Sequence, residues 1–110
     1  MDEQPKKVIG SGSYKIHLTE ISQYSIETFG FMQAEKYVYT ISQLVENLDT
    51  QYTYHPECRY LPTKSRIYRN IILDAHLIIY RITERQIEVL DIIHSASSIR
   101  KIRNVRSIRI

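Results

Sequence analysis

The second half of the chain contains three strand-like runs rich in isoleucine and tyrosine, at residues 65–73, 76–83 and 86–94. β-Branched and aromatic residues favour strands. Only two residues separate each run from the next, and so short a connection joins strands that run antiparallel. The sequence therefore predicts an antiparallel meander, and this feature restricts the fold most, because the apolar face of the sheet needs a cover.

Two predicted helices supply that cover. Residues 33–49 contain no Gly or Pro, and their apolar residues recur at the spacing of one helical stripe. A shorter helix is predicted from Thr19 to Phe29, with Gly30 at its end because glycine tolerates the backbone conformation that closes a helix. The short turn between the helices predicts an antiparallel hairpin. The stripe consists of Ala34, Tyr37, Val38, Ile41, Leu44, Val45 and Leu48.

The residues before the helices predict one more strand. Apolar and polar residues alternate from Tyr14 to Leu18, the pattern of a half-buried strand, whereas residues 1–13 are polar and predict a disordered leader. The result is an α+β fold of the order β-α-α-β-β-β, a mainly antiparallel sheet covered on one face by the helical hairpin. Besides the stripe, the predicted core contains Ile16, Leu18, Ile21, Phe29, Ile78, Tyr80, Val89 and Leu90.

Composition excludes several classes of protein. The 110 residues are 43% hydrophobic and 25% charged, which fits one globular domain. No apolar run reaches the roughly 18 residues that span a bilayer, and the polar N-terminus has no apolar signal region, so we expect a cytoplasmic protein. The single cysteine, Cys58, is interpreted as a structural thiol, and the four histidines lack the spacing of metal ligands. Neither a metal nor a cofactor is predicted.

The net charge of +3 is unevenly distributed. Residues 95–110 contain five cations and no acid, which leaves the rest of the chain at −2. Residues 58–73 form a second acid-free stretch. Such clusters favour a surface that binds phosphate or an acidic partner. A solvated basic tail would also explain the cluster at residues 95–110. The C-terminal segment 99–110 has Ile99, Ile102, Val105 and Ile108 between its arginines, which predicts an amphipathic helix or an edge strand.

Complete catalytic motifs are missing from the sequence. It contains no Gly-rich phosphate loop, no His-Glu-x-x-His and no Gly-x-Ser-x-Gly. The remaining candidates are Arg66, Arg69 and Arg81 on paired strands and His94 at the end of the last strand. Surface charges that protect the sheet would explain the arginines equally well, and a structural role is the ordinary one for an isolated histidine.

Several segments together resemble the RelE/ParE superfamily of bacterial toxins. They are YSIETFG at 24–30, QAEKY at 33–37, YRNI at 68–71, HLIIYRI at 76–82 and IEVLDIIH at 87–94. The similarity extends over residues 14–101, the toxin domain being residues 14–98. It implies the β-α-α-β-β-β fold and a toxin of a type II toxin-antitoxin system that a cognate antitoxin neutralises.

The resemblance implies one of two targets. RelE-like toxins cut messenger RNA in the ribosomal A site, whereas ParE-like toxins inhibit DNA gyrase. RelE-like toxins carry an arginine three residues before the tyrosine of the middle strand, where this chain has Leu77, and SASS at 95–98 replaces their cations and terminal tyrosine. An aliphatic side chain cannot stabilise the charge that develops during RNA cleavage. The Phe29-Gly30 turn and Arg69 are more similar to the ParE-like branch, so we expect a gyrase inhibitor.

The expected target-binding residues are basic. They are Lys64, Arg66, Arg69, Arg81, His94, Arg100, Lys101 and Arg103. One alternative is a ribosome-dependent mRNA interferase in which Arg69, Arg81 and His94 are catalytic; another is a degenerate toxin that acts only as a basic binding domain. We expect the antitoxin to lay an apolar stripe across the helical hairpin and to extend along the sheet. Without it, exposed isoleucines favour a homodimer.

Overall fold

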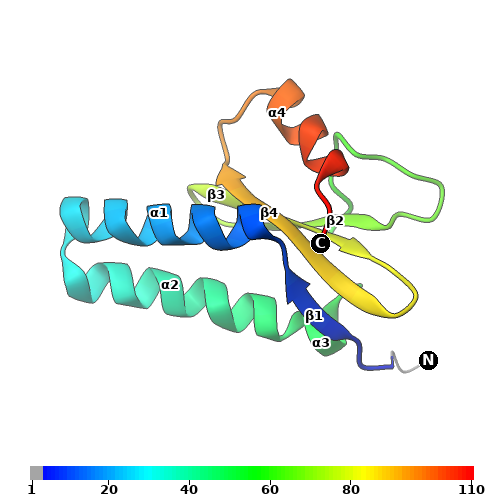
Figure 1. The fold of residues 1–110 in the computed structure, drawn as a ribbon, viewed down its shortest axis with the longest axis horizontal. Helices are drawn as coiled ribbons and strands as arrows, with labels where there is room; N and C mark the ends of the chain where they lie inside the picture. Colours follow the sequence, from blue (N-terminus) through cyan, green and yellow to red (C-terminus); the bar gives the residue numbers. More distant parts are fainter. Residues whose placement is uncertain (1–3) are drawn as a thin grey trace.

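The computed structural model describes residues 4–110, which form an α+β domain around a four-stranded sheet (Figure 1). The strands are β1 (Lys7–Gly10), β2 (Tyr68–Ile72), β3 (His76–Ile82) and β4 (Gln86–His94), in the order β1-β4-β3-β2. Strands β2, β3 and β4 form the predicted antiparallel meander, while β1 pairs with β4 in parallel. The mainly antiparallel sheet is thereby confirmed.

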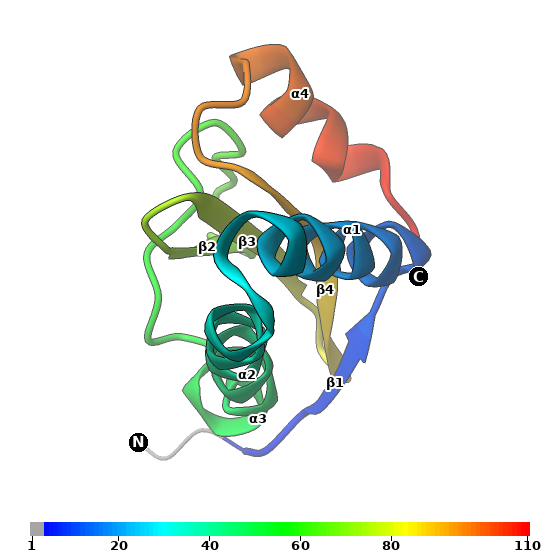
Figure 2. The same ribbon diagram turned by 90° about the vertical axis from the view of Figure 1, so that its left-hand side faces the viewer.

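The helical hairpin is also confirmed. Helix α1 (Gly12–Phe29) and helix α2 (Phe31–Glu46) are separated only by Gly30, and the short α3 (Leu48–Gln51) follows. Gly30 has φ +90°, a backbone conformation that side-chain-bearing residues rarely adopt. Figure 2 shows the two long helices nearly end-on, side by side along the sheet. Their inward residues join one buried cluster with residues of β2, β3 and β4, so both helices cover the same face.

The predicted strand at Tyr14–Leu18 is wrong, because these residues belong to α1. Tyr14, Leu18 and Ile21 pack against the core at helical spacing, which leaves Ile16 61% exposed. The strand lies earlier, at Lys7–Gly10, and the helix begins after Ser11, whose Oγ accepts the N–H of Tyr14 at 3.0 Å. A side chain that caps a first turn in this way favours helix over strand.

Two further expectations need correction at this end of the chain. The disordered leader is wrong for residues 7–13, which form β1 and the start of α1, while residues 1–3 lie outside the described residues. The helix predicted from Thr19 begins seven residues earlier, at Gly12. A Cβ at Gly10 would lie 2.9 Å from the ring of Tyr14, so a glycine lets β1 pass close to the first turn of α1.

The predicted core is correct apart from two residues. Ala34, Ile41, Leu48, Ile78, Tyr80, Val89 and Leu90 are buried, whereas Leu18, Ile21, Tyr37, Val38, Leu44 and Val45 are half-buried. Ile16 and Phe29 are 61% and 64% exposed. Phe29 is the last residue of α1, where the hairpin has passed the end of the sheet and no strand lies beneath it (Figure 1).

A second cover lies on the other face of the sheet. The C-terminal segment forms a helix, α4 (Ile99–Asn104), and a 3-10 turn, η1 (Val105–Ser107), rather than an edge strand. Ile102 and Val105 are buried there with Ile79, Leu90 and Ile93 of the sheet. The loop after α3 contributes Leu61 and Cys58, and burial raises the pKa of the Cys58 thiol. The sheet is therefore covered on both faces.

Candidate partner-binding groove and basic face

A groove of about 890 Å³ lies between the helical hairpin and the ends of β3 and β4. Its apolar and aromatic lining comprises Ile21, Tyr24, Phe29, Tyr37, Ile92 and Ile93. Its polar lining includes His17 and Glu20 from α1, Lys36 from α2, His76 and His94 from the strands, and Lys101 from α4. A volume of this size and a mixed lining are typical of binding sites.

Further apolar and aromatic side chains are exposed on the two long helices. Phe31 and Met32 begin α2 with 65% and 76% of their area exposed, and Tyr24 and Tyr39 are exposed by 62% and 65%. The hairpin extends past the sheet in Figure 1, and Phe31 and Tyr39 line a second, smaller hollow with Ile26 and Val38. Grouped exposed apolar side chains mark an interaction surface more often than single ones do.

Two of the groove's histidines are held by other side chains. His17 Nδ1 lies 2.5 Å from Oδ1 of the buried Asp91, and the same oxygen accepts the N–H of Ile92 at 2.8 Å. His76 Nδ1 lies 2.6 Å from the hydroxyl of Tyr37. These contacts fix both imidazole rings, and the second also joins α2 to the sheet.

His94 is the cross-strand partner of His76. Their rings are 5.8 Å apart, centroid to centroid, and Nδ1 of His94 accepts the N–H of Ala96 at 3.0 Å. Burial lowers the pKa of His76, and the nearby His94 lowers it further because two positive imidazolium rings repel each other. The neutral form of His76 is therefore favoured as the groove stands.

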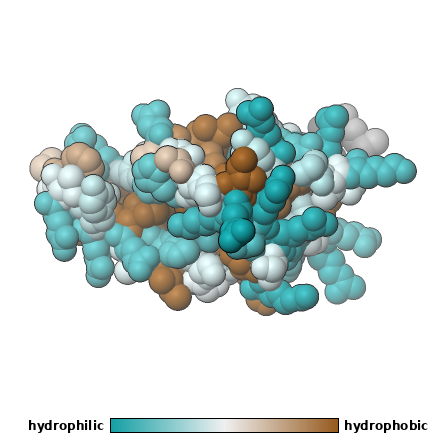
Figure 3. All heavy atoms as spheres, turned by 90° about the horizontal axis from the view of Figure 1, so that it is seen from above, coloured by the Kyte–Doolittle hydropathy of each residue, from teal (hydrophilic) through white to brown (hydrophobic). Residues whose placement is uncertain are grey.

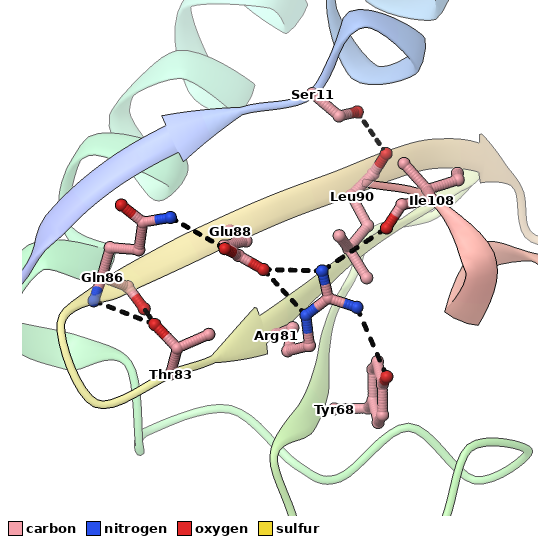
Figure 4. A network of polar contacts seen from close by, with 8 residues as sticks. All are labelled: Ser11, Tyr68, Arg81, Thr83, Gln86, Glu88, Leu90 and Ile108. Carbon is pink, nitrogen blue, oxygen red and sulfur yellow. Dashed lines mark hydrogen bonds and ion pairs between the residues drawn. The ribbon is translucent and has the colours of Figure 1, made fainter. Parts of the chain in front are cut away.

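Arg81, a predicted target-binding residue, is bound within the molecule (Figure 4). Its Nε donates to Oε1 of Glu88 at 2.8 Å, and its other nitrogens reach the Tyr68 hydroxyl and the Ile108 carbonyl at 3.4 Å each. Burial alone would raise the pKa of Glu88, but hydrogen bonds from Gln86 and Arg81 and the charge of Arg81 outweigh it, so that pKa is lowered. The guanidinium thus links β3, β4, β2 and the C-terminal segment.

Arg69 has a similar internal role in the loop after α3. Its Nε donates to the Arg66 carbonyl at 2.9 Å, and its Nη1 donates to the carbonyls of Thr53 and His55 at 3.1 and 2.9 Å. Backbone carbonyls of an irregular loop need such partners. Arg66 itself has φ +56°, so this loop is held in an unusual conformation.

The other predicted cations are exposed. Lys64 and Arg66 stand on the loop, and Arg100, Lys101 and Arg103 stand on α4, on the same side of the sheet because loop and helix share one buried cluster. Figure 3 shows this side, where hydrophilic side chains surround scattered hydrophobic ones. We call these five residues the basic face.

The predicted site residues thus fall into three places. Arg69 and Arg81 are engaged in internal hydrogen bonds, the basic face is exposed, and His94 lies in the groove with Lys101. Sequence reasoning missed His17, His76 and Lys36. One signal was available: His76 and His94 lie about equally far from the Glu84-Arg85 junction, so a tight β3–β4 hairpin places them opposite each other.

Comparisons with known proteins agree with this architecture. Residues 9–99 match the sequence profile of the ParE toxin of the type II toxin-antitoxin system parDE. The fold defines a toxin of the RelE/ParE type, and with this match over most of its length the chain belongs to the ParE toxin family.

A solved structure shares the fold. A chain described as "Chromosomal ParDE TA system from P. aeruginosa" is 17% identical and superposes with a TM-score of 0.68, covering 84% of this chain and 98% of that one. No curated protein sequence matches significantly. In residues 4–110, no helix is long and apolar enough to cross a membrane, and no cluster of three His, Cys, Asp or Glu side chains is arranged to hold a metal ion.

Proposed function

We propose that this protein is a ParE-type toxin that inhibits DNA gyrase in the cytoplasm and is neutralised by a cognate antitoxin. Its membership of the ParE toxin family supports the general class. The choice of gyrase over messenger RNA rests on one observation, which is the closed state of the sheet face that carries Leu77, Ile79 and Arg81.

A ribonuclease site needs an open, charged cleft on that face. Instead, Ile79 packs in a buried cluster with Ile102 and Val105 of the C-terminal segment. Leu77 offers no charge, and the guanidinium of Arg81 is paired with Glu88. Stabilisation of a phosphorane needs donors aimed at the site where charge develops, and each missing donor costs about a hundred- to a thousandfold in rate. These contacts favour a toxin that binds its target without cutting RNA.

Target contact is assigned to the basic face. The five cations of this face are exposed, and they lie on the side of the sheet that α4 and the loop after α3 cover. Such a cluster attracts an acidic protein surface or DNA phosphates, and its contribution falls with salt. Arg69 and Arg81 support this face indirectly, since they hold the loop and the C-terminal segment in place.

Antitoxin contact is assigned to the hairpin and the groove. Besides the exposed Phe31 and Tyr39, which line a second hollow of the hairpin, the apolar lining of the groove offers an amphipathic segment a surface on which to pack. Hiding it in a complex removes apolar area from water, whereas the free toxin exposes it and favours self-association.

The decisive experiment compares the two targets with one protein preparation. We expect the purified chain to inhibit gyrase supercoiling and to leave messenger RNA uncut on translating ribosomes in a primer-extension assay. Co-expression with the product of an adjacent antitoxin gene should restore growth and yield a co-purifying complex. Cleavage within the A-site codon with gyrase unaffected would establish the interferase instead, and harmless expression would indicate a degenerate toxin.

Matched variants test the assignment of the target site. Replacing Arg100 and Arg103 by Gln should reduce gyrase inhibition without loss of fold, because both side chains are exposed. Replacing Lys7 and Lys15 by Gln removes the same charge from exposed positions on β1 and α1 and should leave inhibition intact. Equal effects of the two pairs would mean that net charge, rather than the basic face, determines activity.

A further inference from the structure

The polar part of the groove lining brings cationic and hydrogen-bonding groups together from four elements. His76 and His94 come from β3 and β4, Lys36 from α2 and Lys101 from α4. The two histidine rings are in contact, and the Tyr37 hydroxyl holds one of them. Within residues 4–110, neither lysine forms an ion pair, so both ammonium groups are available to a ligand.

The hydrogen bonds determine which ring nitrogen carries the proton. Nδ1 of His94 accepts a backbone N–H, so the neutral ring must carry its proton on Nε2. The Tyr37 hydroxyl is protonated at neutral pH, because burial raises its pKa and the charge of Asp74 raises it further. A protonated hydroxyl can donate to Nδ1 of His76, and a ring that accepts this bond also carries its proton on Nε2.

The two Nε2–H groups are thus both donors, and within the described chain no acceptor is bonded to them. An ammonium group of Lys36 and another of Lys101 add further donors. This is a set of donors without a matching acceptor, the arrangement that binds an anion.

The other charged groups in and near the groove do not supply the missing acceptor. On the α1 wall, His17 is bonded to Asp91 of β4, so the Asp91 charge is already used. Glu20 of α1 is the carboxylate that lines the groove, and Asp74 acts on Tyr37 from the turn before β3. The lining therefore has two cations, Lys36 and Lys101, against the one carboxylate of Glu20, so it is net positive even while its histidines are neutral.

We propose that His76, His94, Lys36 and Lys101 form a binding site for a carboxylate side chain of the antitoxin segment, and that filling this site is coupled to proton uptake by the two histidines. The inference rests on the proposed function, since it names the polar group that the hairpin's partner must carry. A carboxylate is favoured over a purely apolar segment because such a segment would leave four donors buried without acceptors.

The direction of the pH dependence follows from this arrangement. In the free protein, burial and mutual repulsion keep the pKa of His76 low. A bound carboxylate places a negative charge beside both rings, which favours the imidazolium form and raises the pKa. The complex then holds more protons than the separate proteins, so its affinity increases as the pH falls, by up to about tenfold per pH unit for each proton taken up.

The test is a calorimetric titration of the full-length toxin with its antitoxin at about pH 6, 7 and 8, in buffers of different ionisation enthalpy that report proton uptake. We expect the affinity to rise by about 3- to 100-fold from pH 8 to 6. His94→Gln keeps a donor near the Nε2 position but does not titrate, so it should reduce the proton uptake and flatten the pH dependence. His55→Gln, outside the groove, should change neither.

A second pair of variants separates the effect of lysine charge on affinity from the effect of histidine protonation on its pH dependence. Lys36→Gln should weaken antitoxin binding at every pH, by roughly 3- to 30-fold, and leave the dependence of affinity on pH almost unchanged. Lys15→Gln removes an equal charge from an exposed position of α1 that does not line the groove, and its affinity should match the unmodified protein. Thermal unfolding of each variant shows whether its fold is intact.

The outcomes distinguish this inference from the proposed function. Tight binding that is independent of pH, or an unchanged slope in His94→Gln, overturns the carboxylate site while antitoxin recognition stands. The absence of any complex contradicts the proposed function. NMR titration of the toxin alone with acetate then tests the site directly: Cε1–H signals of His76 and His94 should shift and that of His55 should not, and unshifted signals overturn the inference.

Discussion

The two faces of the sheet use the same kinds of residue in opposite ways. On the face covered by α4, the guanidinium of Arg81 and the carboxylate of Glu88 bind each other, and aliphatic side chains fill the space around them. On the hairpin face, the helices leave a groove whose histidines and lysines retain free donors. The chain itself closes one face, whereas the other has an open groove, which we propose is the site of a partner.

The difference shows that the position of a charge says little until its neighbours are known. Arg69 and Arg81 were candidates because they are cations on strands, yet their hydrogen bonds go to carbonyls, a carboxylate and a phenol of the same chain. His76 was no candidate, although it lies where several elements meet. Four substitutions test this contrast between a structural face and a binding face.

The largest effect is expected in the core beneath α4. Ile102→Ala removes a side chain that is 4% exposed and should lower the free energy of unfolding by about 2–5 kcal/mol. Ile99→Ala, in the same helix but 46% exposed, should cost no more than about 0.5 kcal/mol. Urea unfolding of both variants measures the difference, and equal losses would mean that α4 does not pack as described.

The next effect concerns the ion pair on that face. Arg81→Met leaves the Glu88 carboxylate, with 13% of its side-chain area exposed, without its cation. We expect a loss of about 2–3 kcal/mol, somewhat less than for a fully buried pair. The double variant Arg81→Met, Glu88→Met should recover part of the lost stability in urea unfolding, since no charge is then left unpaired.

The same pair predicts a pH dependence. Because the pKa of Glu88 is lowered in the folded protein, its contribution is complete above the pKa of the unfolded chain and disappears as the pH falls through the folded value. The stability gap between the unmodified protein and Arg81→Met should therefore narrow below about pH 4. A gap that widens in acid would contradict the assigned direction.

On the binding face, a substitution should affect the complex and not the fold. Phe31→Ser changes a residue that is 65% exposed, so we expect stability to stay within about 0.5 kcal/mol. The antitoxin complex should weaken by about 1–2 kcal/mol, or five- to thirtyfold in Kd, because an aromatic anchor is lost. Tyr54→Ser, 79% exposed on the opposite loop, is the control that should bind normally.

The smallest effect concerns the attachment of the hairpin to the sheet. Tyr37→Phe removes the hydroxyl that joins α2 to His76 and should cost about 0.5–1.5 kcal/mol of stability. Tyr39→Phe removes the same group from a side chain that is 65% exposed and should be neutral. If the two variants unfold at the same urea concentration, the Tyr37–His76 contact contributes nothing to the attachment of the hairpin.

The meander and the second helix could be predicted because each has a clear period and clear breaks. The first strand could not, because Tyr14 and Leu18 satisfy the strand period of two and the helical spacing of four at once. Residues Lys7–Gly10 are too few to show a period, and only their pairing with β4 makes them a strand. The predicted disordered leader is wrong at residues 7–13 because four strand residues are too few to show a period.

The candidate site was harder to predict than the fold. The exposure of the basic face agrees with what charge density predicts, while its role in target binding stays a prediction. The groove depends on how far α1 and α2 extend past the sheet, which no local pattern encodes. His17 meets Asp91 across most of the chain length, and a contact at that distance is visible only once the helices are placed.

The parallel pairing of β1 with β4 has a consequence for the synthesis of the protein. The strand that leaves the ribosome first must wait for the strand made last, since Ser11 and its partner Leu90 are 79 positions apart. Pairing over such a separation requires a large loop to close, which slows folding. Until then the nascent hairpin has no sheet to pack on. The groove therefore forms only after β4 has been synthesised, and the basic face only after α4 has followed it.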